Sequence, residues 1–361
     1  MGASSRKRTL RSGYTTGACA AAAAKAAVFC LLGREHPETV EISFPDGSRH
    51  CFSLCRTGGQ PAMATVVKDA GDDPDVTNGA EIGAEVNWLA RRPTERIVLT
   101  NGPGVGLVTK PGLPVSIGQA AINPVPRQMI RAAVAEALTG SGREGEGVEV
   151  RIFVRDGEIL AEKTLNRRLG VIGGLSILGT TGIVRPVSAQ AWTDTIEASM
   201  QVARAIGLTE TILSTGRTSE VMVQGLLRLP EEAQVMMGDY LRYALEAARR
   251  HGFSRIHLAA MWGKLVKAAL AVPQTHVRNG ALEVRQAADL LVRLGLDRDS
   301  AAEFRAANTA REIYDRLQSM RRNDLIDAVC RRAGEQARHW SGLPVRVYLV
   351  TAEEGVVHVA D

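Results

Sequence analysis

Residues 170–186 read GVIGGLSILGTTGIVRP, a short apolar segment with glycines on both sides and two adjacent threonines after it. Glycine reaches backbone conformations that other residues avoid, so glycines flanking an apolar run indicate that the backbone approaches something closely there. The apolar residues from Leu175 to Leu178 predict a buried strand. We interpret this stretch as a strand whose carboxyl end carries a ligand-binding turn.

From this stretch to the C-terminus, short apolar runs alternate with amphipathic segments. The runs SIL, TILS and RIHLAA precede predicted helices at 193–206, 239–250 and 264–271. Further helices are predicted at 283–294, 301–319 and 323–339, and VRVYLV supplies a late strand. Such alternation is typical of parallel βαβ units. Residues 169–361 are therefore predicted to form an α/β domain.

The preceding residues, 1–168, show no such alternation and predict a mixed α+β domain. A helix is expected at 17–32, capped by Thr15 or Thr16 and ended by Gly33. A hairpin is expected at 40–54, around the turn Pro45-Asp46-Gly47. Strands at 63–68, 96–100, 148–154 and 159–164 and a helix from 125 or 126 to 138 complete this domain.

Composition limits the classes of function. The 361 residues carry a net charge of +5, a mild excess that suits an anionic small molecule better than a nucleic acid. The five cysteines have no framework spacing, which favours a reducing compartment and a cytoplasmic protein. ACAAAAAKAAVFCLLG could pass for a signal peptide, but Lys25 interrupts it, so a helix is the favoured interpretation. No apolar stretch is long enough to span a membrane. Dimerisation is plausible for an enzyme of this size.

Two loops after predicted strands are candidates for ligand binding. In a doubly wound sheet, ligands gather at the carboxyl ends of the strands, where glycine turns let backbone amides approach them. The first loop contains Gly179, Thr180, Thr181 and Gly182, and the second contains Ser214, Thr215, Gly216, Arg217 and Thr218. Ordinary βα turn chemistry is the alternative for either loop alone. The two together favour a binding floor rich in amide and hydroxyl groups.

The absence of nucleotide-binding motifs limits the kind of cofactor that the chain is expected to bind. Neither G-x-G-x-x-G nor a phosphate loop ending in Gly-Lys-Ser/Thr occurs. NGPGVG, at 101–106, is rich in glycine, but no helix clearly begins at its end, so a pyrophosphate site has no support. A cofactor without phosphates is the better hypothesis.

Metal and histidine chemistry have weak support in the sequence. Four aspartates lie within seven positions, yet they do not match the twelve-residue calcium loop, so turns and N-caps are favoured and no metal is predicted. They are Asp69, Asp72, Asp73 and Asp75. The seven histidines show no H-x-x-x-H pair and no Cys/His nucleophile pattern. No catalytic residue is assigned.

Several stretches in one order resemble the cobalt-precorrin-5B C1-methyltransferase family of corrin-ring biosynthesis. They are SGYTTGACAAAAAKAA, VVKDAGDDPDVTNGAEI, GPGVGLVTKPGL, GQAAINPVPRQMI, LNRRLGVIGGLSILGTTGIVRPVS and GKLVKAAL followed by THVRN. Together they extend from Ser12 to Asn279. The resemblance implies S-adenosylmethionine as methyl donor, a Rossmann-like second domain and an anionic cobalt-containing tetrapyrrole as substrate.

On this basis the two glycine loops are predicted to hold the cofactor, with Asp194 as a further polar contact. A second set of residues is predicted to grip the carboxylated rim of the tetrapyrrole: Thr15, Thr16, Lys110, Asn123, Arg127, Lys264 and His276. Methyl transfer from a sulfonium needs orientation and no nucleophilic side chain, which agrees with the absence of a catalytic motif.

The chain departs from the family pattern in its later part. Met261-Trp262 stands where a Gly-His pair is expected, and Gln274 stands where a histidine is expected. An altered substrate is one interpretation of these departures. Two other functions remain open at this stage: a non-catalytic tetrapyrrole-binding or delivery protein, and, more weakly, a nucleotide-dependent enzyme that uses NGPGVG.

Overall fold

The computed structural model describes residues 10–34, 37–90, 95–186, 188–275 and 284–361. The chain divides into two compact units, Met1–Ser188 and Ala189–Asp361. Each unit folds around a hydrophobic core of its own.

The first unit is built on a five-stranded sheet with the order β4-β5-β6-β10-β7. Only β10 and β7 pair in parallel in this sheet; its other neighbours are antiparallel. The strands are β4 (Arg56–Gly58), β5 (Ala62–Val67), β6 (Glu81–Trp88), β7 (Ile97–Asn101) and β10 (Val148–Val154). A separate hairpin consists of β2 (Thr39–Ser43) and β3 (Arg49–Ser53), as predicted.

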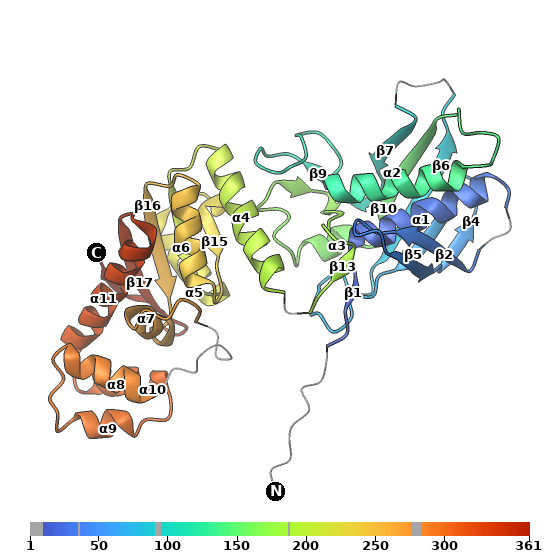
Figure 1. Cartoon of the computed structure of the whole chain (residues 1–361). Coiled ribbons are helices and arrows are strands. Elements are labelled where there is room, and N and C mark those ends of the chain that lie inside the picture. Colours follow the sequence, from blue (N-terminus) through green and yellow to red (C-terminus); the bar gives the residue numbers. More distant parts are fainter. Residues whose placement is uncertain (1–9, 35–36, 91–94, 187, 276–283) are drawn as a thin grey trace, which may run out of the picture. The chain divides into compact units, whose positions relative to one another are not determined.

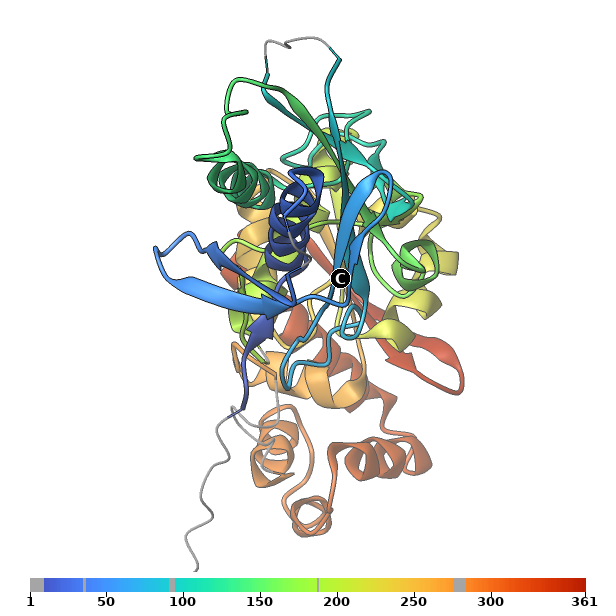
Figure 2. The same cartoon turned by 90° about the vertical axis from the view of Figure 1, so that its right-hand side faces the viewer.

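Two helices lie side by side in this unit, α1 (Thr16–Leu31) and α2 (Pro124–Leu138), and α1 packs on β5 and β6 (Figures 1 and 2). Helix α1 begins where the sequence predicts, because the Thr15 hydroxyl accepts a hydrogen bond from Ala18 N–H at 3.2 Å. Its alanine-rich sequence is buried as far as Val28. Small side chains therefore let the sheet and α2 approach α1 from different sides.

Residues 170–186 belong to the first unit, which corrects the predicted boundary at 168–169. Three two-residue strands in this stretch pair with earlier segments of the same unit: β11 (Val171–Ile172) with β9 (Leu107–Val108), β12 (Gly174–Leu175) with β8 (Gly104–Val105), and β13 (Ile183–Val184) with β1 (Gly13–Tyr14). Leu175 and Ile177 are buried in the core of this unit. The boundary between the units lies twenty residues later than predicted. The reason is that these three pairings attach residues 170–186 to strands of the first unit.

The second unit contains a five-stranded sheet with the order β15-β14-β16-β17-β18. In chain order this is 2-1-3-4-5; the first four strands are parallel neighbours and the last is antiparallel. The strands are β14 (Glu210–Ser214), β15 (Gln234–Met236), β16 (Arg255–Ala260), β17 (Val345–Thr351) and β18 (Gly355–Ala360). The parallel βαβ units expected from the sequence are present in β14–β17.

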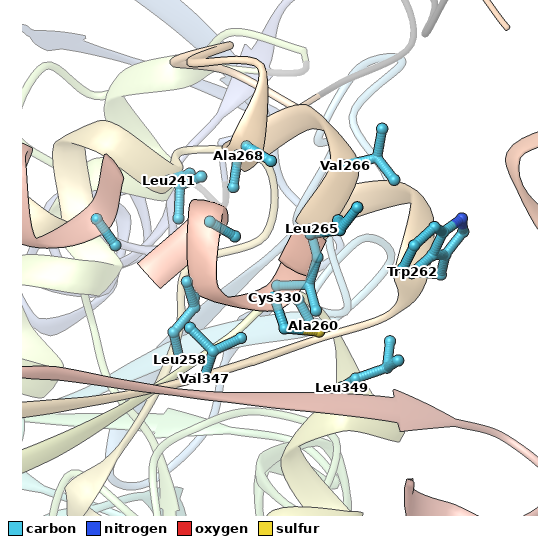
Figure 3. Packing of buried hydrophobic residues seen from close by; sticks show 14 of the residues in the cluster. Leu241, Leu258, Ala260, Trp262, Leu265, Val266, Ala268, Cys330, Val347 and Leu349 are labelled. Carbon is cyan, nitrogen blue, oxygen red and sulfur yellow. The ribbon is translucent and has the colours of Figure 1, made fainter. Parts of the chain in front are cut away.

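Helices cover both faces of this sheet. On one face, Val223 of α5 (Arg217–Leu227) shares a cluster with Ile212 and Tyr348. On the other, Leu258 and Val347 share a cluster with Leu241, Leu265 and Cys330 (Figure 3). These three residues belong to α6 (Leu241–Arg250), α7 (Trp262–Ala269) and α11 (Asn323–Ser341), and α4 (Ala189–Ala205) packs on β15 and α6. The unit also contains α8 (Val284–Arg293), α9 (Ala301–Arg305), α10 (Ala310–Ser319) and a 3-10 turn at Glu231–Ala233.

Three further element predictions need correction. The strand expected at 159–164 is instead α3 (Gly157–Ala161), which starts after Asp156 adopts a left-handed conformation. The single helix expected at 301–319 is two helices, because Thr309 caps a new helix by accepting from Glu312 N–H. Helix α5 was missed: the predicted 214–218 loop runs directly into it.

Candidate functional site

The amino-terminal ends of α1 and α2 meet in the first unit. Gly17 N–H donates to Leu178 C=O at 3.0 Å, and Asn123 N–H donates to Ile177 C=O at 2.9 Å. A Cβ on Gly17 would lie 2.7 Å from Pro126, so glycine permits the two helix ends to touch. Neither helix has an acidic residue in its first turn. Two positive helix ends therefore lie close together.

The turn Gly179–Gly182 lies against these helix ends. Gly179 and Gly182 have φ values of +126° and +84°, which favour glycine, and a Cβ on Gly182 would lie 2.6 Å from the Phe44 ring. A Cβ on Gly179 would collide with Thr15. Thr180 and Thr181 are exposed. The prediction that this turn ends a strand of the second domain was wrong, because the backbone approach it permits is to Thr15 and Phe44.

Four of the predicted substrate residues gather in this region. Thr16 is buried and bonds to Leu178, while Thr15 and Asn123 occupy the cap positions of the two helices. The Arg127 guanidinium donates to Ile122 C=O at 2.7 Å and to Ala120 C=O at 2.9 Å. Burial, followed by the charge of Arg131, lowers the pKa of Arg127. Their role as substrate ligands stays a prediction.

Lys110 contacts the 168–170 segment of the same unit. Its Nζ donates to Arg168 C=O at 3.3 Å, and its aliphatic part lies where a Cβ on Gly170 would be. Gly170, with φ of +78°, is thus the glycine that lets the 168–170 backbone lie on this lysine.

The second unit has its own candidate site, at the carboxyl ends of the parallel strands. Strand order reverses between β14 and β16, because β15 lies on one side of β14 and β16 on the other. Crevices outside such a reversal are the usual ligand sites of open α/β sheets. A small cavity, too tight to admit a water molecule, lies here. Its lining includes Thr215 after β14, Met237 after β15 and Ala260 at the end of β16.

The rim of this switch-point cavity carries charge. Lys264 and Thr275 both line it. The Lys264 ammonium forms an ion pair with Asp239 and donates to the carbonyl and the hydroxyl oxygen of Thr275, at 3.2 Å each. Lys267 donates to the same carbonyl at 2.7 Å. Burial, and then repulsion by Lys264, lower the pKa of Lys267.

The loop Ser214–Gly216 lies at this edge, as predicted. Ser214 is buried, and its Oγ has no hydrogen-bond partner among the described residues. Gly216 precedes α5 and has open space where a Cβ would be. The sequence therefore brings Ser214, Thr215, Gly216 and Lys264 to one edge of one sheet.

Asp194, the predicted polar contact, is exposed on α4 and accepts a hydrogen bond from Gln190 at 2.7 Å. Sequence reasoning missed Asp239 as an acidic residue at the sheet edge. The signal that could have found it is Gly238-Asp239 directly after the apolar run VMM at 235–237. Gly238, with φ of +55°, turns the chain there against the Trp192 ring.

The residues that depart from the expected family pattern lie next to the same edge. Met261 is 40% exposed, whereas Trp262 starts α7, is buried and packs against Tyr314 with ring centroids 5.5 Å apart. Gln274 borders a second hollow of about 340 Å³, beside Tyr240 and Tyr243. His276 lies outside the described residues.

Across the described ranges, no group of three or more metal-binding side chains could hold a metal ion. Asp69 instead pairs with Arg11, and Asp75 bonds to Lys68 and Thr77. Within the same ranges, no helix has both the length and the apolar character needed to cross a membrane.

Comparison with known proteins assigns both units to one family. The CbiD family matches residues 3–186, and the CbiD C-terminal domain matches residues 274–361. The chain is 57% identical to a cobalt-precorrin-5B C(1)-methyltransferase of Desulfotalea psychrophila, covering 98% of each chain. It is 47% identical to the Geobacter sulfurreducens protein of the same name, covering 97% of this chain and 99% of the relative. A crystal structure of a cobalamin biosynthesis protein (CbiD) from Archaeoglobus fulgidus is 30% identical, with a TM-score of 0.41 over 71% of this chain and 78% of that one.

Proposed function

Because the chain belongs to the CbiD family, whose relatives are named cobalt-precorrin-5B C(1)-methyltransferases, it is a C1-methyltransferase of cobalamin biosynthesis, and we propose that S-adenosylmethionine is its methyl donor. We propose further that the second unit is Rossmann-like and holds this donor. The substrate in this proposal is the anionic tetrapyrrole for which the relatives are named.

The observation that carries the donor site is the reversal of strand order between β14 and β16. At this reversal, Ser214–Gly216 and the end of β16 come together around the switch-point cavity. The lining is apolar apart from Thr215, Lys264 and Thr275, a composition that suits an organic ligand held by a few polar groups. Gly216 leaves the backbone open at the start of α5, so amide groups can reach a ligand there.

We assign the tetrapyrrole rim to the first unit. The two helix ends at Thr15–Gly17 and Asn123–Pro124 present positive dipole ends without a nearby acidic first turn, which favours carboxylates. Arg127 supplies a guanidinium in the first turn of α2. Lys110, Thr16 and the Gly179–Gly182 turn complete the proposed surface of this unit.

The bound donor supplies an activated methyl group on sulfonium, so the reaction is a direct displacement at carbon. The protein's contribution is then to hold the accepting carbon in line with that methyl, and orientation of this kind contributes on the order of 7–11 kcal/mol. Buried, hydrogen-bonded elements suit this task. Ser214 and Thr215 continue a buried parallel strand, which fixes their backbone.

The location and assembly state are also proposals. The five cysteines all lie in the described ranges and form no disulfide there, which is consistent with a reducing compartment such as the cytoplasm. The proposed assembly is a homodimer, which sedimentation analysis of the full chain would test.

Gly216→Ala tests the donor site directly. A Cβ at this position meets no atom within 4 Å, so the variant is expected to fold, yet it would occupy the space through which a ligand reaches the backbone. Gly225→Ala is the matched control, because Gly225 lies on the same helix with equally open surroundings. We expect the Kd for S-adenosylmethionine, measured by calorimetry, to rise about tenfold or more in the first variant alone. Equal affinity in the two variants would show that the donor does not bind at this edge of the sheet.

A further inference from the structure

The second unit contains a hollow with room for a ligand, lined in part by Tyr240 and Tyr243 and called the tyrosine hollow. Its volume is about 340 Å³, within the usual size range of small-molecule sites. Tyr240 and Gln274 line it, whereas the residues that follow them, Leu241 and Thr275, line the switch-point cavity. Because consecutive Cα atoms are about 3.8 Å apart, the hollow lies next to the carboxyl ends of the parallel strands.

The wall of the hollow offers aromatic and aliphatic surface. Tyr240 is the N-cap residue of α6 and Tyr243 lies three residues later, a spacing that puts side chains on one face of a helix. Val272 and Pro273, from the segment after α7, also line the hollow. Arg242 N–H donates to Pro273 C=O at 3.2 Å, which attaches this segment to α6. A flat ring of a ligand would therefore contact apolar groups of two attached segments.

Both tyrosine rings are held in place by residues of α4 and its surroundings. The Trp192 ring stacks on Tyr240 with centroids 6.4 Å apart and planes 24° apart, and Trp192 Nε1–H donates to Met237 C=O at 2.9 Å. The Tyr243 hydroxyl donates to Glu197 at 2.8 Å. Neither Trp192 nor Glu197 belongs to the described lining of the hollow, so these contacts leave the lining surfaces of the rings to a ligand. Side chains that are already ordered lose little conformational entropy on binding.

The charges of the lining favour a neutral ring over the tetrapyrrole. Among the described lining residues, the charged ones are Arg242 and Glu246, which form an ion pair at 2.8 Å. A macrocycle edged with carboxylates would meet Glu246, and like charges repel. Stacking of a base on an aromatic ring needs no charge. Gln274 adds a side-chain amide, which has the donor and the acceptor that pair with the edge of a purine.

We propose that the tyrosine hollow holds the adenine ring of the methyl donor, in contact with Tyr240 and Tyr243. This inference rests on the proposed function and deepens it, because it assigns a place to one part of S-adenosylmethionine. With the base in the hollow, the ribose and the sulfonium extend toward the neighbouring switch-point cavity, where Ser214–Gly216 follows β14.

The test measures binding to the full-length chain by calorimetry, with three probes. They are S-adenosylmethionine, 5′-methylthioadenosine, which keeps the adenine but lacks the amino-acid part, and uroporphyrin, a metal-free tetrapyrrole with carboxylated side chains. Tyr240→Leu and Tyr243→Leu remove the aromatic rings, and the phenylalanine variants at the same positions restore them. Trp340→Leu, on α11 and outside the described lining, removes an aromatic ring elsewhere in the same unit. Far-ultraviolet circular dichroism verifies that each variant is folded.

A second measurement needs no variant. The 8-azidoadenine form of the donor is photolysed with the wild-type chain, and mass spectrometry identifies the labelled peptide. We expect the label on residues 238–246 or 272–275.

In the binding test, we expect each leucine variant to weaken S-adenosylmethionine and 5′-methylthioadenosine about tenfold or more, because base–aromatic stacking is lost, and each phenylalanine variant to recover most of this loss. Uroporphyrin binding should stay the same in the leucine variants, and Trp340→Leu should change no affinity.

Wild-type affinity for S-adenosylmethionine in both leucine variants would overturn the assignment of the hollow while leaving the donor in place, and so would a label found only on other peptides. A loss confined to uroporphyrin would also overturn it, because the hollow would then hold the tetrapyrrole. Failure of the wild-type chain to bind S-adenosylmethionine would instead overturn the proposed donor, and this inference with it.

Discussion

Thr16 and Leu178, which are 162 residues apart in sequence, exchange two hydrogen bonds: the Thr16 hydroxyl donates to the Leu178 carbonyl at 3.1 Å and accepts from the Leu178 amide at 2.8 Å. This pair ties the start of α1 to the segment that leads into the Gly179–Gly182 turn. The turn is therefore held by the first unit through side-chain as well as backbone bonds.

Replacement of Thr16 by valine should loosen this attachment. The shape is nearly kept, but the Leu178 amide loses its partner and the Leu178 carbonyl keeps only the bond from Gly17 N–H, at a cost of about 1–3 kcal/mol in the free energy of unfolding. Thr16→Ser keeps the hydroxyl and serves as control. Amide hydrogen exchange should become faster at Leu178 in the valine variant only. Equal exchange in wild type and both variants would show that the pair contributes little.

Gly182 and Gly173 distinguish two reasons why a position requires glycine: a positive φ and a lack of space for a Cβ atom. Their φ values, +84° and +81°, impose almost the same backbone strain on any other residue. A Cβ meets Phe44 at position 182 and nothing within 4 Å at position 173. We expect Gly182→Ala to lower the free energy of unfolding of the first unit, measured with urea, by about 1–3 kcal/mol more than Gly173→Ala, the usual cost of overpacking. Equal losses would mean that Phe44 moves aside freely.

The buried pair Lys68 and Asp75 predicts a pH effect. Burial opposes ionisation of Asp75, but hydrogen bonds from Lys68 and Thr77 hold the pKa of its carboxyl below the usual value. A lowered folded-state pKa means that the stabilisation is complete above the ordinary value of about 3.9 and is lost as pH falls through the folded-state pKa. Asp75→Asn should remove this acid-dependent part of the stability.

At pH 7 the same variant leaves the Lys68 ammonium, 1% exposed, without its carboxylate. The expected loss is about 3–5 kcal/mol in the free energy of unfolding. The double variant Lys68→Met with Asp75→Asn should recover much of this loss, because no buried charge remains. Urea unfolding at several pH values from 7 to 3 measures both effects. A variant with the acid sensitivity of the wild type would contradict this account.

Local signals in the sequence predicted many of the elements. Thr15 and Gly33 bound α1 as expected, and the Pro45-Asp46-Gly47 turn marks the first hairpin. The Ser214–Gly216 loop and Lys264 were predicted separately as ligand contacts and meet at one edge, because parallel strands bring their carboxyl ends together. Caps and turns depend on residues that are close in sequence, and the parallel direction of the strands follows from the alternation of strands and helices. Both can be predicted from sequence patterns.

The features that the sequence did not predict depend on contacts between residues that are far apart in sequence. In 170–186 each strand has only two residues, so its partner is set by tertiary packing and leaves no periodic signal. Asp239 and Thr275 meet because the chain after α7 folds back, with Thr275 N–H donating to Asp239 C=O at 2.9 Å. Neither residue type nor spacing indicates such a return.

Truncation tests where the first unit ends. A fragment of residues 1–168 lacks Leu175 and Ile177, which are almost fully buried, and leaves the sites they cover exposed. Burying two such side chains is worth about 3–6 kcal/mol, a large part of a typical domain stability of about 5–15 kcal/mol. The 1–168 fragment also loses the partners of β1, β8 and β9. We therefore expect residues 1–188 to unfold cooperatively on heating, followed by circular dichroism, and 1–168 to show a much lower Tm or no transition. Similar transitions in the two fragments would place the boundary back near 168, because the three short strands would then add nothing to the stability of the first unit.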